Sequence, residues 1–128
     1  MTLLLDTHTL LWAMLGDSRL SRPAQTAIEN ATNEVFISVV CIWEIATKVR
    51  IGKMEEPGNL LKDPRRSLQQ QGFRDLSLTL GHARLGGLLA GAHRDPFDRM
   101  LAAQALLENL TLVSADTALD DFGVTRLW

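Results

Sequence analysis

The sequence predicts a single α/β domain in which a five-stranded parallel sheet is flanked by helices on both faces. A length of 128 residues fits one domain, and the 46% of residues that are hydrophobic are enough for a core. Short apolar runs alternate with longer segments of helical periodicity, as in parallel α/β sheets. No internal repeat or Gly/Ser linker divides the chain, so residues 1–128 are taken as one domain.

Five runs of strand length are rich in apolar or β-branched residues. In order, these predicted strands are Leu3–Asp6, Glu34–Val39, Phe73–Leu78, Thr111–Ser114 and Val124–Trp128. Six segments between them show spacings near 3.6 or helix-capping residues. These predicted helices are Thr7–Leu15, Ser21–Ala31, Val40–Ile51, Asn59–Gln71, Thr79–Ala90 and Pro96–Asn109. Segments 52–58 and 91–94 are predicted loops, the first because it carries a Pro-Gly turn signal.

Composition and charge exclude several classes of protein. The formal net charge of −2 argues against coating nucleic acid through bulk positive charge, although a locally basic face stays open. The single Cys41 lies in an apolar run, so we expect a buried, reduced thiol. No window approaches the ~18 uninterrupted apolar residues of a membrane span, and no Lys or Arg precedes the first apolar run. These features favour a cytoplasmic protein that does not enter membranes.

Two aspartates lie just beyond predicted strands. Asp6 follows Leu3–Leu5, a run apolar enough for a buried central strand, and Asp116 comes shortly after the strand Thr111–Ser114. Ligand sites of open parallel sheets form outside the carboxyl ends of the strands, so both side chains are predicted to face a ligand. Each is equally suited to cap the segment that follows it.

Two further acids complete a predicted quartet. Asp98 lies in the first turn of a helix that Asp95 and Pro96 begin, where it alternatively complements the helix dipole. Glu44 lies in the apolar stretch 35–49, in which Lys48 is the only other charged residue. A carboxylate in such a stretch needs a partner to offset its desolvation, and that partner is either Lys48 or a metal ion.

The four acids predict a divalent metal site at one edge of the sheet. Two like charges about 4 Å apart repel by roughly 4 kcal/mol at an effective dielectric constant of 20, and a cation removes that cost. Carboxylate oxygens suit Mg²⁺ or Mn²⁺, ions that bind phosphates and activate water. The pattern therefore favours phosphodiester hydrolysis, with Asp6, Glu44, Asp98 and Asp116 as catalytic and metal-binding residues.

Four segments together resemble the PIN domain family. They are Leu3–His8, Ile37–Ala46, Asp95–Ala105 and Leu112–Asp116, which occur in the order and spacing of that family. More narrowly, the sequence is similar to the VapC-type toxins of bacterial toxin–antitoxin pairs. The resemblance spans essentially the whole chain. It implies a metal-dependent endoribonuclease that hydrolyses RNA by means of a metal-activated water.

The resemblance also implies roles within the quartet. Asp6 and Asp98 become the central metal ligands, while Glu44 and Asp116 complete the ligand shell or orient water. Ser114 adds a hydroxyl hydrogen bond beside the site.

Two points of the resemblance concern position and partners. The last acidic position of the family varies, so Asp120 and Asp121 compete with Asp116 for it. The resemblance further implies an antitoxin protein as partner and a homodimer.

Several other side chains have two interpretations. Arg94 and Arg99 flank Asp98 and are candidates for contacts with substrate phosphates, although Arg99 alternatively forms a structural ion pair. His93 is expected to be a loop residue rather than a general base, and Trp43 is expected in the core rather than in a binding groove. The mainly basic segment 48–66 either contacts the RNA backbone or is a solvated face.

The alternative function is a catalytically inactive PIN-like scaffold that binds RNA or a protein, because filled acidic positions do not establish turnover. An aspartate-nucleophile phosphatase is disfavoured. Such enzymes place a second carboxylate two residues after the first, where this chain has His8, and no Lys occurs in the C-terminal half.

Overall fold

The computed structural model describes all 128 residues and contains one five-stranded, all-parallel sheet. Its strands follow the spatial order β3-β2-β1-β4-β5. They are β1 (Thr2–Leu5), β2 (Glu34–Ser38), β3 (Arg74–Leu76), β4 (Thr111–Val113) and β5 (Arg126–Leu127). All five predicted strands are therefore confirmed: β1 is shifted by one residue, and the other four are one to three residues shorter than predicted.

Strand β1 lies at the centre of the sheet, as its unbroken apolar run predicts. Leu3, Leu4 and Leu5 are completely buried because β2 and β4 flank the strand and helices cover both faces. Leu5 pairs with Ile37 of β2 and Val113 of β4. The carboxyl ends of the three strands thus meet at one edge, where the chain continues into the candidate site.

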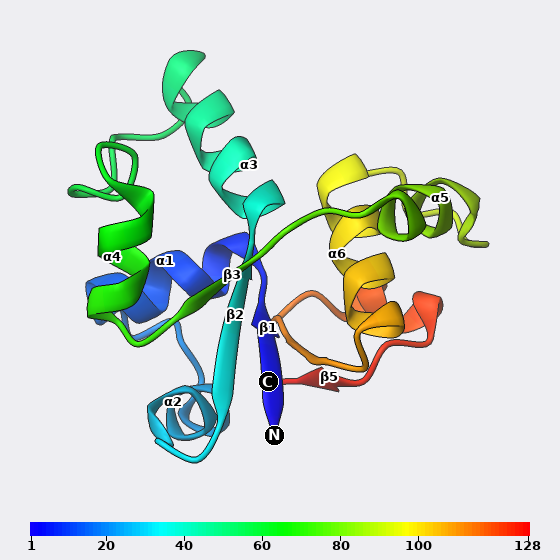
Figure 1. Cartoon of the computed structure of the whole chain (residues 1–128), viewed down its shortest axis with the longest axis horizontal. Helices are drawn as coiled ribbons and strands as arrows, with labels where there is room; N and C mark the ends of the chain where they lie inside the picture. Colours follow the sequence, from blue (N-terminus) through cyan, green and yellow to red (C-terminus); the bar gives the residue numbers. More distant parts are fainter.

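Six α-helices and one 3₁₀ helix connect the strands. They are α1 (Thr7–Leu15), α2 (Arg22–Glu29), α3 (Val39–Arg50), α4 (Pro64–Gln70), α5 (Leu80–Leu88), α6 (Pro96–Leu107) and η1 (Thr117–Phe122). Figure 1 shows α1, α2 and α4 on one side of the sheet and α5 and α6 on the other. None of these helices combines the length and the apolar character that a bilayer span requires.

Two differences from the predicted elements have local causes. The helix predicted from Asn59 begins only at Pro64, because proline disfavours helical geometry in the residue before it and Asp63 caps the new first turn. The 3₁₀ helix η1 was not predicted. Its N-cap is Asp116, whose carboxylate accepts the backbone N–H of Ala118 at 3.0 Å.

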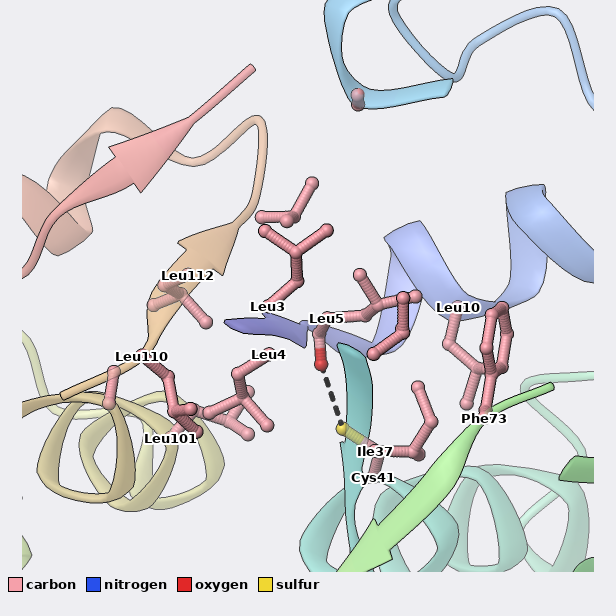
Figure 2. Close-up of a cluster of buried hydrophobic side chains, with 14 of the residues drawn as sticks. Leu3, Leu4, Leu5, Leu10, Ile37, Cys41, Phe73, Leu101, Leu110 and Leu112 are labelled. Atoms are coloured by element: carbon pink, nitrogen blue, oxygen red, sulfur yellow. Dashed lines mark hydrogen bonds between the residues drawn. The ribbon is translucent and has the colours of Figure 1, made fainter. Parts of the chain in front are cut away.

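The main core lies between β1 and its flanking helices. Figure 2 shows Leu4 of β1 beside Leu101 of α6, while Leu5 and Ile37 lie toward Leu10 of α1.

Cys41 of α3 lies in the same core, and its thiol donates to the Leu5 carbonyl at 3.7 Å (Figure 2). Burial is the main cause that raises the pKa of the Cys41 thiol to about 12. The predicted buried thiol is therefore confirmed.

Candidate metal centre

Asp6 lies directly after β1, and both of its carboxylate oxygens are held. Oδ1 accepts the backbone N–H of Thr9 at 2.9 Å, so Asp6 caps α1. Oδ2 accepts the hydroxyl of Ser114 at 2.5 Å. The side chain is only 9% exposed. Asp6 therefore caps α1 and also faces the candidate site.

Ser114 connects two of the predicted site residues. It follows β4, is fully buried, and donates its hydroxyl to Asp6. The same hydroxyl oxygen accepts the backbone N–H of Asp116 at 3.0 Å. Ser114 thereby links the turn after β4, which carries Asp116, to the carboxylate of Asp6.

Asp98 lies at the third position of α6 and meets a histidine from the preceding loop. Nε2 of His93 lies 2.8 Å from Oδ2 of Asp98. Burial raises the pKa of Asp98, and the His93 hydrogen bond partly offsets this rise. The hydrogen bond to Asp98 in turn raises the pKa of His93.

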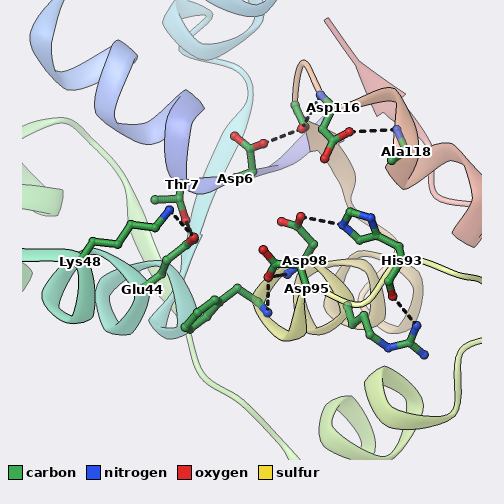
Figure 3. A network of polar contacts seen from close by, with 12 residues as sticks. Asp6, Thr7, Glu44, Lys48, His93, Asp95, Asp98, Asp116 and Ala118 are labelled. Carbon is green, nitrogen blue, oxygen red and sulfur yellow. Dashed lines mark hydrogen bonds and ion pairs between the residues drawn. The ribbon is translucent and has the colours of Figure 1, made fainter. Parts of the chain in front are cut away.

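The carboxylates come together at the strand ends, as the sequence predicted. Figure 3 shows Asp6, Asp98 and Asp116 grouped around one space, with Glu44 to one side beside Lys48. One ligand atom from each of His93, Asp98 and Asp116 lies within 4.8 Å of the other two. The negative charges of Asp6, Glu44 and Asp98 also contribute to the raised pKa of Cys41, after the larger effect of burial.

The donor set fits a hard divalent cation. Ligand atoms that share an octahedral Mg²⁺ lie roughly 3 to 4.2 Å apart, because each lies about 2.1 Å from the ion. The ligand atoms of His93, Asp98 and Asp116 lie within 4.8 Å of one another, which is close to this range. Carboxylate oxygens suit Mg²⁺ and Mn²⁺, while the imidazole nitrogen tolerates Mn²⁺ and later transition metals better than Mg²⁺.

Glu44 is held differently from the three aspartates. Its Oε1 accepts the hydroxyl of Thr7 at 2.5 Å, and its Oε2 lies 2.9 Å from Nζ of Lys48. Glu44 is only 8% exposed, so the positive charge of Lys48 offsets the free-energy cost of burying the carboxylate. The predicted Lys48 partner is thus present, and Glu44 is not part of the group of ligand atoms that His93, Asp98 and Asp116 form.

Arg99 does not face the space between the carboxylates. Its guanidinium donates to three backbone carbonyls, those of Gly86 and His93 at 2.9 Å each and that of Leu89. It also lies over the ring of Phe122. The structure therefore gives Arg99 neither the phosphate contact nor the ion pair that the sequence suggested. Its three carbonyl partners come from Gly86 in the last turn of α5 and from Leu89 and His93 in the segment after it, and no sequence pattern predicts these contacts.

The other candidate site residues, Arg94, Asp120 and Asp121, are exposed or paired elsewhere. Arg94 is exposed in the loop before α6. Asp120 is paired with Arg126 at 2.8 Å, and Asp121 is exposed in η1. The carboxylate that lies beside Asp98 is that of Asp116.

His93 lies in a loop, as expected, whereas Trp43 differs from expectation. The contact of His93 with Asp98 depends on a loop conformation that the sequence does not encode as a pattern. Trp43 was expected in the core but is 63% exposed, because α3 buries Cys41, Glu44 and Ile45 on the opposite face. The core prediction for Trp43 is therefore wrong.

Solved structures with the same fold come from several bacteria. VapBC2 from Rickettsia felis, in a complex with a promoter DNA fragment, is 16% identical, with 99% of this chain and 98% of that chain covered and a TM-score of 0.67. VapBC-1 from nontypeable Haemophilus influenzae is 15% identical over 99% and 97% of the two chains, with a TM-score of 0.68. FitAcB from Neisseria gonorrhoeae is 18% identical over 98% and 96%, with a TM-score of 0.60. At these identities, the likeness concerns the fold.

No curated protein matches the sequence. The sequence model of the PIN domain matches residues 3–124, which is nearly the whole chain and includes all four predicted acids. The protein therefore belongs to the PIN domain family.

Proposed function

We propose that this protein is a metal-dependent endoribonuclease of the VapC type, the toxin of a toxin–antitoxin pair. The observation that carries the proposal is the grouping of Asp6, Asp98 and Asp116 around one space beside the ends of β1 and β4 (Figure 3), with ligand atoms of Asp98, Asp116 and His93 within 4.8 Å of one another. The match to the PIN domain, and the fold shared with VapBC and FitAcB structures, support a nuclease in such a pair.

Asp6, Asp98 and Asp116 are the residues that would hold Mg²⁺ or Mn²⁺, with Glu44 as the fourth acid. When bound, the cation supplies a water activated for attack on phosphorus and neutralises the charge that develops on the phosphate oxygens. The chain prepares this site before any substrate arrives. Ser114 fixes the Asp6 carboxylate and the turn that carries Asp116, which limits the reorganisation needed for binding.

The surrounding residues act on orientation and charge. His93 donates to one oxygen of Asp98 and leaves the other for a ligand. Exposed Arg94 is placed to contact substrate phosphates from the loop before α6. In the absence of a cation, the cluster of carboxylates repels the RNA backbone, so the chain requires metal both for binding and for hydrolysis.

We further propose an antitoxin protein as the partner, a homodimeric assembly and a cytoplasmic location. These three follow from the similarity to VapC-type toxins and from the fold shared with structures named VapBC. Bacterial RNA is the substrate class, and its sequence and cut site are to be identified by experiment.

The test uses purified full-length protein, freed of any copurifying partner, with total bacterial RNA. Discrete cuts are expected in Mg²⁺ or Mn²⁺, and their loss is expected both in EDTA and in Asp6→Asn. Asp121→Asn is the matched control, because it removes an exposed carboxylate of the same region and is expected to cut normally. RNA that stays intact with folded wild-type protein in both metals would favour the non-catalytic scaffold.

A further inference from the structure

An aromatic pair, exposed Trp43 and half-buried Phe97, lies between the two helices that carry Glu44 and Asp98. The Trp43 side chain of α3 is 63% exposed, and its ring centroid lies 5.1 Å from that of Phe97 in α6. The rings meet edge to face, with an interplanar angle of 74°. Phe97 therefore braces the indole from one side while most of the indole surface stays open to solvent.

The pair adjoins the candidate metal centre on both helices. Trp43 directly precedes Glu44, and Phe97 directly precedes Asp98. Helices α3 and α6 contact each other, and the ring pair is one of the contacts between them. Exposing a large aromatic surface to water is unfavourable. Aromatic surfaces that stay exposed beside a polar site are typical of surfaces that bind a partner.

The exposed face of α3 continues from this ring toward a cation. Arg50 lies seven residues, about two turns, after Trp43, and exposed Ala46 lies between them. The face therefore presents a flat aromatic surface and then a guanidinium. Single-stranded nucleic acid is bound through this combination, in which bases stack on aromatic rings and cations contact the backbone.

We propose that Trp43, braced by Phe97, is a stacking site for an unpaired base of single-stranded RNA beside the phosphate held at the acidic cluster. This inference depends on the proposed function, because that function brings an RNA strand to Glu44 and Asp98. The edge-to-face contact holds the indole in place before binding, so less side-chain entropy is lost when a base stacks on it. Stacking is tolerant of sequence, since every base has a flat face.

The experiment measures RNA binding without cleavage. In the Asp6→Asn background with Mg²⁺, fluorescence anisotropy gives the Kd for a short labelled single-stranded RNA of mixed sequence. A second probe has the same length and phosphates but abasic riboses throughout. Trp43→Leu removes the flat ring and keeps an apolar side chain, whereas Trp43→Phe keeps an aromatic face.

The stacking site predicts that Trp43→Leu weakens binding of the normal RNA about tenfold, while binding of the abasic chain is unchanged. Trp43→Phe is expected to recover most of the affinity. Because Trp43 is exposed, the melting temperature of both variants should match that of the background protein. An equal effect of Trp43→Leu on both probes, or no effect on either, overturns the proposal.

Two further outcomes separate this inference from the nuclease itself. Binding that depends on Trp43, with no cleavage by the wild type in any metal, keeps the stacking site and rejects the nuclease. Unchanged RNA affinity in Trp43→Leu, with loss of a copurifying protein from the same variant, assigns the ring pair to a protein interface and overturns the stacking site.

Discussion

His93 and Asp98 form a direct contact at the candidate metal centre, with 2.8 Å between Nε2 of the imidazole and Oδ2 of the carboxylate. The backbone carbonyl of His93 is held by Arg99, the residue that follows Asp98 in α6. The ring of His93 also meets Phe122 edge-on, with 5.9 Å between the centroids. The loop before α6 is thus tied to the helix whose first turn carries the acid.

Arg99 is expected to stabilise the fold rather than to contact phosphate. Arg99→Ala removes three hydrogen bonds from a guanidinium to backbone carbonyls, so we expect the free energy of unfolding to fall by about 3 kcal/mol. Arg99→Lys should fall between this variant and the wild type. Arg94→Ala, which changes an exposed residue of the neighbouring loop, should stay within about 0.5 kcal/mol. Urea unfolding measures all three, and equal stability of Arg99→Ala and Arg94→Ala would contradict this role.

Asp98→Asn is expected to stabilise the metal-free protein. Burial raises the pKa of Asp98, which means that the folded state disfavours its ionised form. The stabilisation from the neutral carboxyl is present at low pH and is lost as the pH rises through the folded pKa, whereas asparagine keeps a neutral side chain at every pH. Thermal melts in EDTA at neutral pH should show a Tm for Asp98→Asn that is a few degrees higher. A lower Tm would mean that the His93 contact outweighs the cost of the buried charge.

Asp116, rather than Asp120 or Asp121, is expected to serve the site. Asp116→Asn should reduce the rate of RNA cleavage by about 100-fold, because it removes a carboxylate beside Asp98. Asp120→Asn should leave the rate unchanged, since that carboxylate is paired with Arg126. The measurement is the single-turnover rate of cleavage of one RNA by the Asn variants of all three aspartates. A larger loss of rate in Asp120→Asn or Asp121→Asn than in Asp116→Asn would assign the fourth acid of the site to η1.

Cys41 is expected to be inert in the native protein. Its thiol keeps its proton up to a pKa of about 12, chiefly because it is buried, and the thiolate is the reactive species. A thiol-specific reagent at pH 8 should therefore modify the unfolded chain rapidly and the native protein only as fast as it opens. Rapid stoichiometric modification of the native protein would show that the thiol is accessible.

The order of elements was predictable because hydrophobic runs determine it. Leu3–Leu5 could lie only in a buried strand, and this placed Asp6 at the carboxyl edge of the sheet. Lys48 was predictable as a partner of Glu44, because residues four apart share a helix face. These relations depend on spacing along a single element.

The contacts that could not be predicted depend on the path of loops and on which helix face is buried. Two of the three carbonyls that Arg99 contacts lie in the irregular segment after α5, and the contact of His93 with Asp98 depends on the same segment. Trp43 lies on a helix that is apolar over most of its length, so composition did not reveal which side faces solvent. The short helix η1 has too few residues for a periodic signal.

The most direct test of the metal centre is the rate of RNA cleavage as a function of Mn²⁺ concentration, measured in parallel for the wild type, Asp98→Asn and Asp121→Asn. The account predicts cleavage that rises to saturation with Mn²⁺ for the wild type and Asp121→Asn, and no cleavage above background for Asp98→Asn. Cleavage by the wild type that persists in EDTA, or cleavage by Asp98→Asn at the wild-type rate, would contradict it.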